Sequence, residues 1–274
     1  VYLAPVLGKG ATVLDLCQVT RIRRARPVDG GGYLVDYSNL ATRTAACVRA
    51  RRVIVAAGAM NTLRLLFAST RMPDGLGPMP ALGHGFSANG DSVGVWRRES
   101  APVSSFRSIP SQGEFRVGGY ESAVCGVGGF PGFQTLPLPS AVKRQIEKLY
   151  FIYGMGADSG NASVTCDGGQ LRVNYDQRNE PIYDEVRAAF RVLAAETGDR
   201  TWVLGTPVTV HAAGGARLGA DATQGVVDHR GEVYGNPGLY VADGAALPAA
   251  LAAPPSVTIA AWAHHVADGI LQST

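Results

Sequence analysis

The segment VIVAAGAMNTLRLL, residues 53–66, predicts a strand, a tight turn and a helix. Val53 to Ala57 is an apolar run without alternation, which is typical of a strand buried on both faces of a parallel sheet. Gly58 ends this run, and Asn61 or Thr62 is placed to cap the helix that follows. Small residues at a strand end let a ligand approach the backbone, and a helix N-terminus favours an anionic group. Close packing of a strand against a helix requires the same glycine, so a ligand site and a purely structural turn are both open.

Before this segment the sequence predicts a β-hairpin. Residues 12–22 are rich in Val, Leu and Ile, as strands are. Three consecutive glycines, residues 30–32, then turn the chain into a second strand from Tyr33 to Tyr37.

After this segment the pattern changes, which predicts a domain boundary. Residues 73–90 are rich in Gly and Pro, and short broken strands follow. These strands are expected at Ser92–Trp96, Glu114–Tyr120, Tyr150–Met155 and Leu171–Tyr175. A helix is expected to begin at Pro181, to pack on a sheet through a stripe that includes Val186 and Phe190, and to stop at Gly198.

His211 is the first polar residue that could carry chemistry. It follows an expected strand at Val208–Val210 and precedes Gly214-Gly215, which would leave room for a ligand beside the imidazole. A lone histidine is more often a hydrogen-bonded structural residue, so both roles are open until its surroundings are known.

A second polar position ends the apolar strand expected at Leu239–Ala242. Asp243, followed by Gly244, could accept hydrogen bonds from cofactor hydroxyls, or it could cap the turn. A terminal helix is expected to open at Pro254-Pro255, because proline is accepted in the first helical turn. Its buried face should comprise Ile259, Trp262, Val266 and Ile270.

The composition is that of a globular protein with many turns. Of the 274 residues 46% are hydrophobic and 17% are charged, with 35 Gly and 16 Pro, and the formal net charge is +3. Basic clusters within residues 21–26 and 49–52 accompany apolar strand residues without aromatic platforms, so no nucleic-acid partner is expected. The four cysteines are too far apart for a zinc site and are expected to be buried free thiols. No apolar run reaches the roughly 18 residues that a membrane span needs.

The order of these segments resembles that of the glucose-methanol-choline (GMC) oxidoreductases, and most closely their cholesterol oxidase branch. The family shows an Ala-Ala-Gly-Ala turn before a helix, a His-Pro-Leu-Gly-Gly motif, a Leu-Tyr-Val-x-Asp-Gly strand and an Asn-Pro-x-x-Thr-Ile helix start. The matching stretches here are 56–59, 211–215, 239–244 and 254–259. The resemblance extends to residues 2–3 and 19–22 and is weakest over residues 91–204.

The resemblance implies a fold that combines α/β and α+β parts. An incomplete, Rossmann-like FAD-binding domain would consist of residues 1–90 and 205–274. Residues 91–204 would form an inserted, mostly antiparallel substrate-binding sheet.

The resemblance also implies an FAD-dependent enzyme that acts on the CH–OH group of a small hydrophobic, possibly sterol-like alcohol. His211 would accept the hydroxyl proton, a role that suits an imidazole near neutral pH. Glu121 falls near a buried carboxylate that cholesterol oxidases use in double-bond isomerisation, although an ordinary strand-end Glu is the favoured explanation. The residues implied to contact FAD are Val19, Ala57, Gly58, Gly214, Asp243, Gly244, Pro255 and Ser256.

Three departures from the family pattern favour a second hypothesis. The sequence has no Gly-x-Gly-x-x-Gly loop after an N-terminal strand to hold the FAD diphosphate. Pro254 stands where the family has an active-site Asn or His, and proline has no N–H to donate. Ala212 and Ala213 replace the Pro and Leu of the histidine motif. We therefore expect the chain to need an N-terminal FAD-binding segment or subunit, and the alternative is a catalytically silent GMC-like binding or interaction subunit.

The first residues, Val1-Tyr2-Leu3, lack an initiator Met, as expected of a start inside a domain. We expect a soluble protein, in the cytoplasm or secreted as part of a longer precursor.

Overall fold

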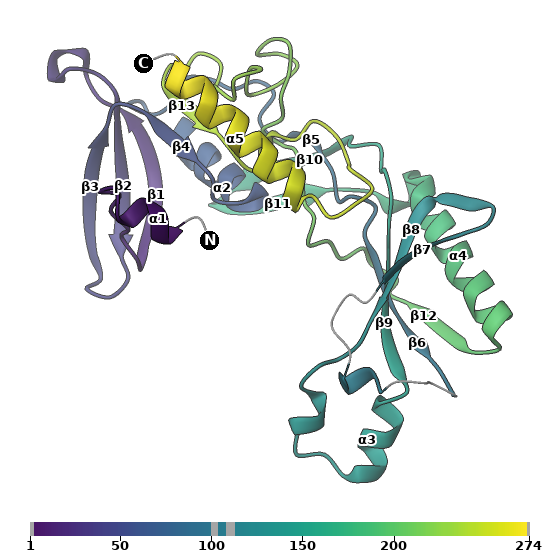
Figure 1. Cartoon of the computed structure of the whole chain (residues 1–274). Coiled ribbons are helices and arrows are strands. Elements are labelled where there is room, and N and C mark those ends of the chain that lie inside the picture. Colours follow the sequence, from purple (N-terminus) through teal and green to yellow (C-terminus); the bar gives the residue numbers. More distant parts are fainter. Residues whose placement is uncertain (1–2, 100–103, 108–112, 273–274) are drawn as a thin grey trace.

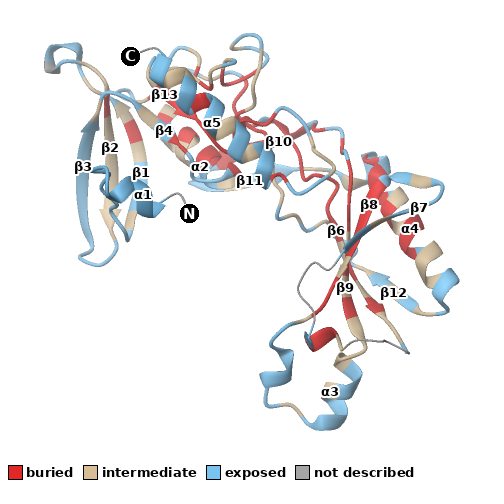
Figure 2. Cartoon of the chain, in the orientation of Figure 1, coloured by how far each residue is buried: buried red, intermediate tan, exposed pale blue. Residues whose placement is uncertain are grey.

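The computed structural model describes residues 3–99, 104–107 and 113–272. Its elements form two bodies, and each has its own buried core (Figures 1 and 2). The combination of helices, antiparallel sheets and one parallel strand pair confirms the predicted fold class. Tyr2, which belongs to the N-terminal match noted above, lies outside the described residues.

The first body begins with a three-stranded antiparallel sheet. The strands of this sheet are β1 (Cys17–Arg24), β2 (Tyr33–Asn39) and β3 (Thr44–Ala50). The short helix α1 (Leu3–Leu7) precedes them in the chain. The predicted hairpin is confirmed, but its first strand begins at Cys17 rather than at residue 12. The Asp36 carboxylate accepts hydrogen bonds from Arg23 Nε at 2.7 Å and from Arg21 Nε at 3.0 Å. These ion pairs account for part of the basic cluster on β1.

A parallel pair of short strands lies at the centre of the first body. It consists of β4 (Val53–Val55) and β13 (Leu239–Val241). The strand predicted from residue 53 is confirmed, but its burial on both faces is not, because Ile54 is 51% exposed. In addition, β13 is the single strand paired with β4 within the described residues, so the second edge of β4 is uncovered.

Two helices flank this strand pair. They are α2 (Ala59–Thr70) and α5 (Ser256–Gln272). The predicted cap of α2 at Asn61 or Thr62 is wrong, because the helix begins two residues earlier and Gly58 occupies the cap position with φ +81°. Helix α5 is confirmed after Pro255, and in its predicted stripe Val266 is buried while Ile259, Trp262 and Ile270 are half-buried.

A small second sheet completes the first body. It contains β5 (His84–Phe86), β10 (Ala162–Asp167) and β11 (Gln170–Asn174). Ala162 and Val164 pack into the same core as Leu63 and Leu239. Residues 162–174 therefore belong to the first body by packing although they lie between residues 91 and 204. The boundaries near 90 and 204 stay a prediction.

The second body is a five-stranded antiparallel sheet covered by a helix. In spatial order its strands are β12 (Arg200–Val203), β6 (Ser92–Arg97), β9 (Leu149–Met155), β8 (Tyr120–Gly128) and β7 (Gly113–Val117). The helices are α3 (Ser140–Ile146) and α4 (Pro181–Thr197). Helix α4 is confirmed: Val186 and Phe190 are fully buried against the sheet, and Gly198 ends it in the left-handed conformation.

Within the part of the chain that the structure describes, five short 3₁₀ turns connect these elements. They are η1 (Pro27–Asp29), η2 (Ser105–Arg107), η3 (Phe133–Thr135), η4 (Gln177–Asn179) and η5 (Gly244–Ala246).

The four cysteines are free thiols, as predicted, but only Cys125 and Cys166 are buried, and Cys47 is exposed. Across residues 3–99, 104–107 and 113–272, no helix is long and apolar enough to cross a membrane. The same residues hold no group of three or more His, Cys, Asp or Glu side chains arranged for a metal ion.

Candidate functional site

His211 is paired with a buried carboxylate, Asp91. The imidazole Nδ1 lies 2.8 Å from Asp91 Oδ2 and 3.1 Å from Oδ1. The Asp91 side chain is 7% exposed and the His211 side chain 19% exposed. Residues 120 positions apart in the sequence thus form one polar pair, which sequence reasoning missed.

The predicted strand at Val208–Val210 is wrong. The structure has irregular backbone there, and Val210 is 86% exposed. Asp91 supplies the reason, because its Oδ2 accepts hydrogen bonds from Thr209 Oγ1 at 2.7 Å and from Val210 N at 3.3 Å. The carboxylate of Asp91 therefore supplies hydrogen bonds that a neighbouring strand would otherwise make to this segment, and the same carboxylate contacts His211.

Asp91 ends a buried turn, residues 87–91, that links the two bodies. Asn89 and Gly90 both have positive φ, at 56° and 58°. The Asp158 carboxylate accepts hydrogen bonds from Ala88 N at 2.8 Å and from the Tyr175 hydroxyl at 2.9 Å. Burial raises the pKa of Tyr175, so its hydroxyl stays protonated and available as a donor. Asp158 thus holds the backbone of this turn in place.

Asn89 fixes the segment before the terminal helix. Its Oδ1 accepts hydrogen bonds from the backbone N–H groups of Leu251 and Ala252, each at 3.0 Å. Its Nδ2 donates to the carbonyl oxygen of Ala253 at 3.2 Å. The next residue is Pro254, so one turn positions both His211 and the proline.

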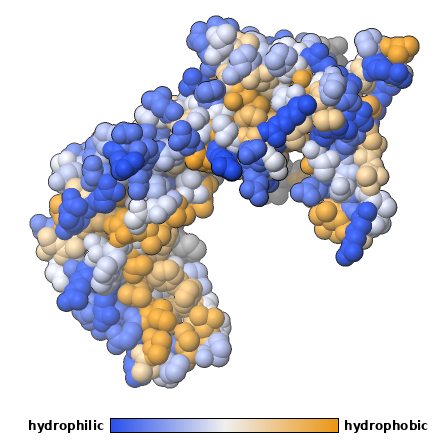
Figure 3. All heavy atoms as spheres, turned by 180° about the vertical axis from the view of Figure 1, so that it is seen from behind, coloured by the Kyte–Doolittle hydropathy of each residue, from blue (hydrophilic) through white to orange (hydrophobic). Residues whose placement is uncertain are grey.

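His211 and Pro254 line the same cavity, which has a volume of about 390 Å³. Most of its other walls come from β6, β9 and the segment before His211. These lining residues are Asp91, Ser92, Val93, Phe151, Tyr153, Gly154, Met155, Val208 and Val210. Apolar atoms dominate this lining. Figure 3 shows apolar side chains gathered along one side of the body built on the five-stranded sheet.

Asp243 joins the turn that follows β4 to the turn that follows β13. Its Oδ2 accepts hydrogen bonds from Gly58 N at 2.9 Å and from Thr62 Oγ1 at 2.5 Å, and its Oδ1 accepts from Ala245 N at 2.9 Å. The side chain is buried. Both carboxylate oxygens therefore have partners within the chain, which supports the capping role that the sequence left open.

Three segments that the sequence analysis singled out lie next to one another. Gly214 N donates to the carbonyl oxygen of Gly244 at 2.9 Å, which ties the histidine loop (residues 211–215) to the Asp-Gly turn (Asp243 and Gly244). A Cβ atom placed on Gly244 would lie 3.3 Å from the Ala212 oxygen and 3.4 Å from Cδ1 of Ile259, on the first turn of α5. The histidine loop, the Asp-Gly turn and the start of the last helix are neighbours.

The glycines differ in whether they leave room for a cofactor. Gly58 is exposed at the start of α2, has φ +81°, and no atom lies within 4 Å of the position its Cβ would take. A Cβ on Gly214 would lie 2.0 Å from the carbonyl oxygen of Gly85, so close packing explains that glycine. Gly58 thus has open space beside its backbone, whereas Gly214 has a structural reason to be glycine.

The remaining candidates occupy different surroundings. Val19 is 42% exposed on β1, Pro255 is buried, and Ser256 is exposed at the first position of α5. Glu121 is exposed near the start of β8 and accepts a hydrogen bond from Gly119 N at 2.9 Å, which lowers the pKa of its carboxyl. It is not among the described residues that line the cavity of His211.

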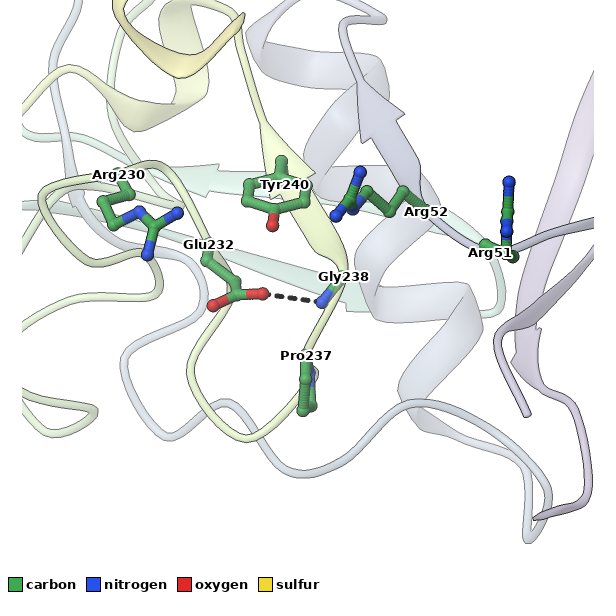
Figure 4. A pocket seen from close by; sticks show the side chains of 7 residues that line it. All are labelled: Arg51, Arg52, Arg230, Glu232, Pro237, Gly238 and Tyr240. Atoms are coloured by element: carbon green, nitrogen blue, oxygen red, sulfur yellow. Dashed lines mark hydrogen bonds between the residues drawn. The ribbon is translucent and has the colours of Figure 1, made fainter. Parts of the chain in front are cut away.

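A larger polar cavity of about 710 Å³ lies at the opposite end of β13 (Figure 4). Its lining residues are Arg51, Arg52, Arg230, Glu232, Pro237, Gly238 and Tyr240. Glu232 accepts a hydrogen bond from Gly238 N at 2.7 Å, and Arg230 donates to the carbonyl oxygen of Gly269 at 3.0 Å. These bonds fasten the start of β13 and the end of α5, away from Asp243, which follows the other end of the strand.

Residues 169–263 match the family model described as GMC oxidoreductase. A cholesterol oxidase of Mycobacterium tuberculosis (strain ATCC 25618 / H37Rv) is 40% identical over 90 residues, which cover 32% of this chain and 16% of that protein. A C-glycoside 3-oxidase of Microbacterium trichothecenolyticum is 29% identical over 296 residues, covering 94% of this chain and 54% of that protein.

Solved structures share the fold. A pyridoxine 4-oxidase from Mesorbium loti superposes with a TM-score of 0.57 at 18% identity, covering 92% of this chain and 56% of that one. A fungal aryl-alcohol oxidase gives a TM-score of 0.61 at 17% identity, covering 94% and 60%. The chain thus spans little more than half the length of the relatives it matches from end to end.

Proposed function

We propose that this chain, whose residues 169–263 match the GMC oxidoreductase family model, takes part in the FAD-dependent oxidation of a hydrophobic alcohol. His211 would accept the hydroxyl proton at Nε2 while the carbinol C–H bond breaks and the carbonyl product forms. When bound, FAD would take up the hydride at its N5 atom. The observation that carries the proposal is that His211, already paired with Asp91, lines a cavity, and that a hydrogen bond from Gly214 N to Gly244 O ties the loop after His211 to the Asp-Gly turn.

The lining of the cavity favours an apolar substrate. Val93, Phe151 and Met155 present apolar surface, and the carboxylate of Asp91 is already hydrogen-bonded to Thr209 and His211. A polyhydroxylated substrate would bury hydroxyl groups without partners, at a cost of about 1–3 kcal/mol each. A compact or sterol-like alcohol with one reacting hydroxyl group suits this surface better.

The same chain would hold FAD only in part. Ala57 and Gly58 would lie against the nucleotide, Val19 against the adenine, and the turn of Gly244 with Ser256 near the flavin. Gly58 supports this because its open surroundings and positive φ suit a close backbone contact. Asp243 would act chiefly by holding Gly58 and Ala245 in place.

A further segment or subunit would complete the cofactor site. The uncovered edge of β4, with Ile54 half exposed, is suited to pair with another parallel strand. The sequence has no Gly-x-Gly-x-x-Gly loop to hold a diphosphate. An N-terminal FAD-binding segment or partner would supply both.

An absorption spectrum tests the cofactor assignment. The chain is purified alone and together with an N-terminal FAD-binding segment added as a second polypeptide, and FAD is supplied to both samples. Flavin absorption that stays with the protein after gel filtration is expected for the mixture. If both samples remain colourless, the cofactor assignment fails.

One observation favours the catalytically silent alternative. Pro254 lines the cavity at the position where the related motif has a hydrogen-bonding side chain, and it cannot donate from its nitrogen. Loss of one preorganised donor costs other enzymes a factor of about 100 or more. A flavin that binds but is never reduced by any alcohol would support this alternative.

A further inference from the structure

We infer that Asp91 is a positioning residue that holds His211 in the tautomer with its hydrogen on Nδ1, so that Nε2 is left as an acceptor. The inference deepens the proposed function, because only an unprotonated Nε2 could take a proton from an alcohol. The tautomer itself is a property of this chain and can be measured without FAD or substrate.

The groups around Asp91 all donate. Thr209 Oγ1 accepts a hydrogen bond from His211 N at 2.9 Å, so its own hydrogen is directed to Asp91 Oδ2, 2.7 Å away. Val210 N donates to the same oxygen at 3.3 Å, and Asn89 Nδ2 donates to Oδ1 at 3.3 Å. Besides the imidazole, each described group that bonds to the carboxylate is a donor, so Asp91 serves as an acceptor toward all of them.

This leaves one arrangement for the imidazole. A neutral histidine carries one ring hydrogen, and the nitrogen that faces a carboxylate must be the donor. Nδ1 of His211 is that nitrogen, at 2.8 Å from Oδ2. The hydrogen therefore resides on Nδ1, and Nε2 keeps its lone pair.

The backbone keeps Asp91 in place. The turn before it is buried, and the Asp158 carboxylate and the Asn89 amide bind it to two other segments. Ser87 and Ala213 exchange two backbone hydrogen bonds, at 2.9 and 3.1 Å, which join the turn to the residues after His211. The carboxylate and the imidazole are therefore attached to one rigid unit, so their contact is preorganised.

The substitution Asp91→Asn should remove the exclusive preference for this tautomer. Thr209 Oγ1 and Val210 N both require an acceptor at the Oδ2 position, so the amide oxygen of the new residue should take that place. The amide nitrogen would then replace Oδ1, which lies 3.1 Å from His211 Nδ1. An amide N–H there would donate to an unprotonated Nδ1, whereas the amide oxygen at the Oδ2 position, 2.8 Å from Nδ1, would still accept from a protonated one. The tautomer with its hydrogen on Nε2 should therefore become populated beside the wild-type tautomer. The same carboxylate-to-amide change in a Ser-His-Asp triad lowers kcat by about 10⁴ through the wrong tautomer.

The test is ¹⁵N NMR of the histidine rings in the full chain, at a pH where His211 is neutral. The His211 signals are assigned by their loss in His211→Gln. We expect the wild type to show a protonated Nδ1 and an unprotonated Nε2, and Asp91→Asn to show a substantial population of the opposite tautomer. Asp158→Asn is the control, because it loosens the same turn without touching the imidazole and should keep the wild-type tautomer.

A wild-type spectrum with the hydrogen on Nε2, or with both tautomers equally populated, would overturn the inference even if Asp91→Asn fails to fold. An Asp91→Asn protein with native circular dichroism and an unchanged tautomer would do so as well. Failure to bind FAD would overturn the proposed function alone, because the tautomer is measured on the chain without cofactor.

Discussion

Gly214 donates its backbone N–H to the carbonyl oxygen of Gly244 at 2.9 Å, and this bond joins the loop of His211 to the turn of Asp243. The two segments follow different strands or loops and meet at the start of the last helix. The chemistry proposed for the imidazole and the cofactor contacts proposed for the turn would therefore belong to one site. The predictions below test the contacts that hold this site together and then its chemistry.

Thr62→Val should destabilise the protein by about 1–3 kcal/mol, because it leaves the buried carboxylate of Asp243 without one of its donors. Urea unfolding followed by circular dichroism measures the change. Thr197→Val is the matched control, since its hydroxyl bonds to a helix carbonyl at an exposed position, and its effect should stay within about 0.5 kcal/mol. Equal effects of the two substitutions would contradict the assignment.

Gly154→Ala should push helix α4 away from the sheet. The new Cβ would lie 2.3 Å from Cγ1 of Val186, and overpacking of this kind costs about 1–3 kcal/mol. Val186→Ala removes the obstructing methyl groups. The loss of unfolding free energy in the double variant should therefore be smaller than the sum of the losses in the two single variants. Gly118→Ala serves as the control, because no atom lies within 4 Å of its Cβ position. Strict additivity would argue against this contact.

Asp36→Asn should reduce stability at neutral pH and much less in acid. The Arg23 guanidinium beside Asp36 holds the pKa of that carboxyl well below its ordinary value, with Arg21 contributing. A lowered pKa in the folded state stabilises the protein above the unfolded pKa of about 3.9, and this stabilisation is lost as the pH falls toward the folded value. The wild type should therefore exceed the variant by about 1.5 kcal/mol at pH 7.

Urea titrations between pH 7 and pH 3 test the same prediction. The difference between wild type and Asp36→Asn should shrink below about pH 4. A difference that is constant over this range would show that Asp36 stabilises the sheet through shape rather than charge.

Much of the local structure could be predicted from the sequence. Helix α4 and its stop at Gly198, helix α5 after Pro255, and the turn at Gly58 follow from short-range periodicity and capping, which neighbouring residues decide. The family resemblance that these motifs suggested is confirmed by the match of residues 169–263.

The polar pairs could not be predicted in the same way. Thr62 is one of the two residues that the sequence offers as a helix cap, but its hydroxyl binds Asp243, 181 residues away. Asp91 lay at the end of a Gly- and Pro-rich stretch that the sequence marked only as a boundary. The cluster Ser87-Ala-Asn-Gly-Asp91 was the available signal, since Asn and Gly at successive positions favour positive φ and so mark a tight, specific turn.

Substrate selection tests the chemistry of the cavity. With the flavin-loaded assembly, kcat/KM for cyclohexanol should exceed that for a polyhydroxylated ring of the same size by about tenfold or more per extra hydroxyl group, because each would be buried without a partner. Initial rates with both alcohols measure the ratio. A preference for the polyol would contradict the apolar assignment of the cavity lined by Val93 and Phe151.

The most direct test of the account is the rate at which a hydrophobic alcohol reduces the bound flavin without oxygen, followed by the loss of flavin absorption. With cyclohexanol as substrate, His211→Gln should reduce this rate by about 10²–10⁴-fold, which is the usual contribution of a general base. His84→Gln, which alters an exposed histidine on β5, should leave it unchanged. Reduction of the His211→Gln flavin at the wild-type rate would contradict the central claim that this imidazole accepts the substrate proton.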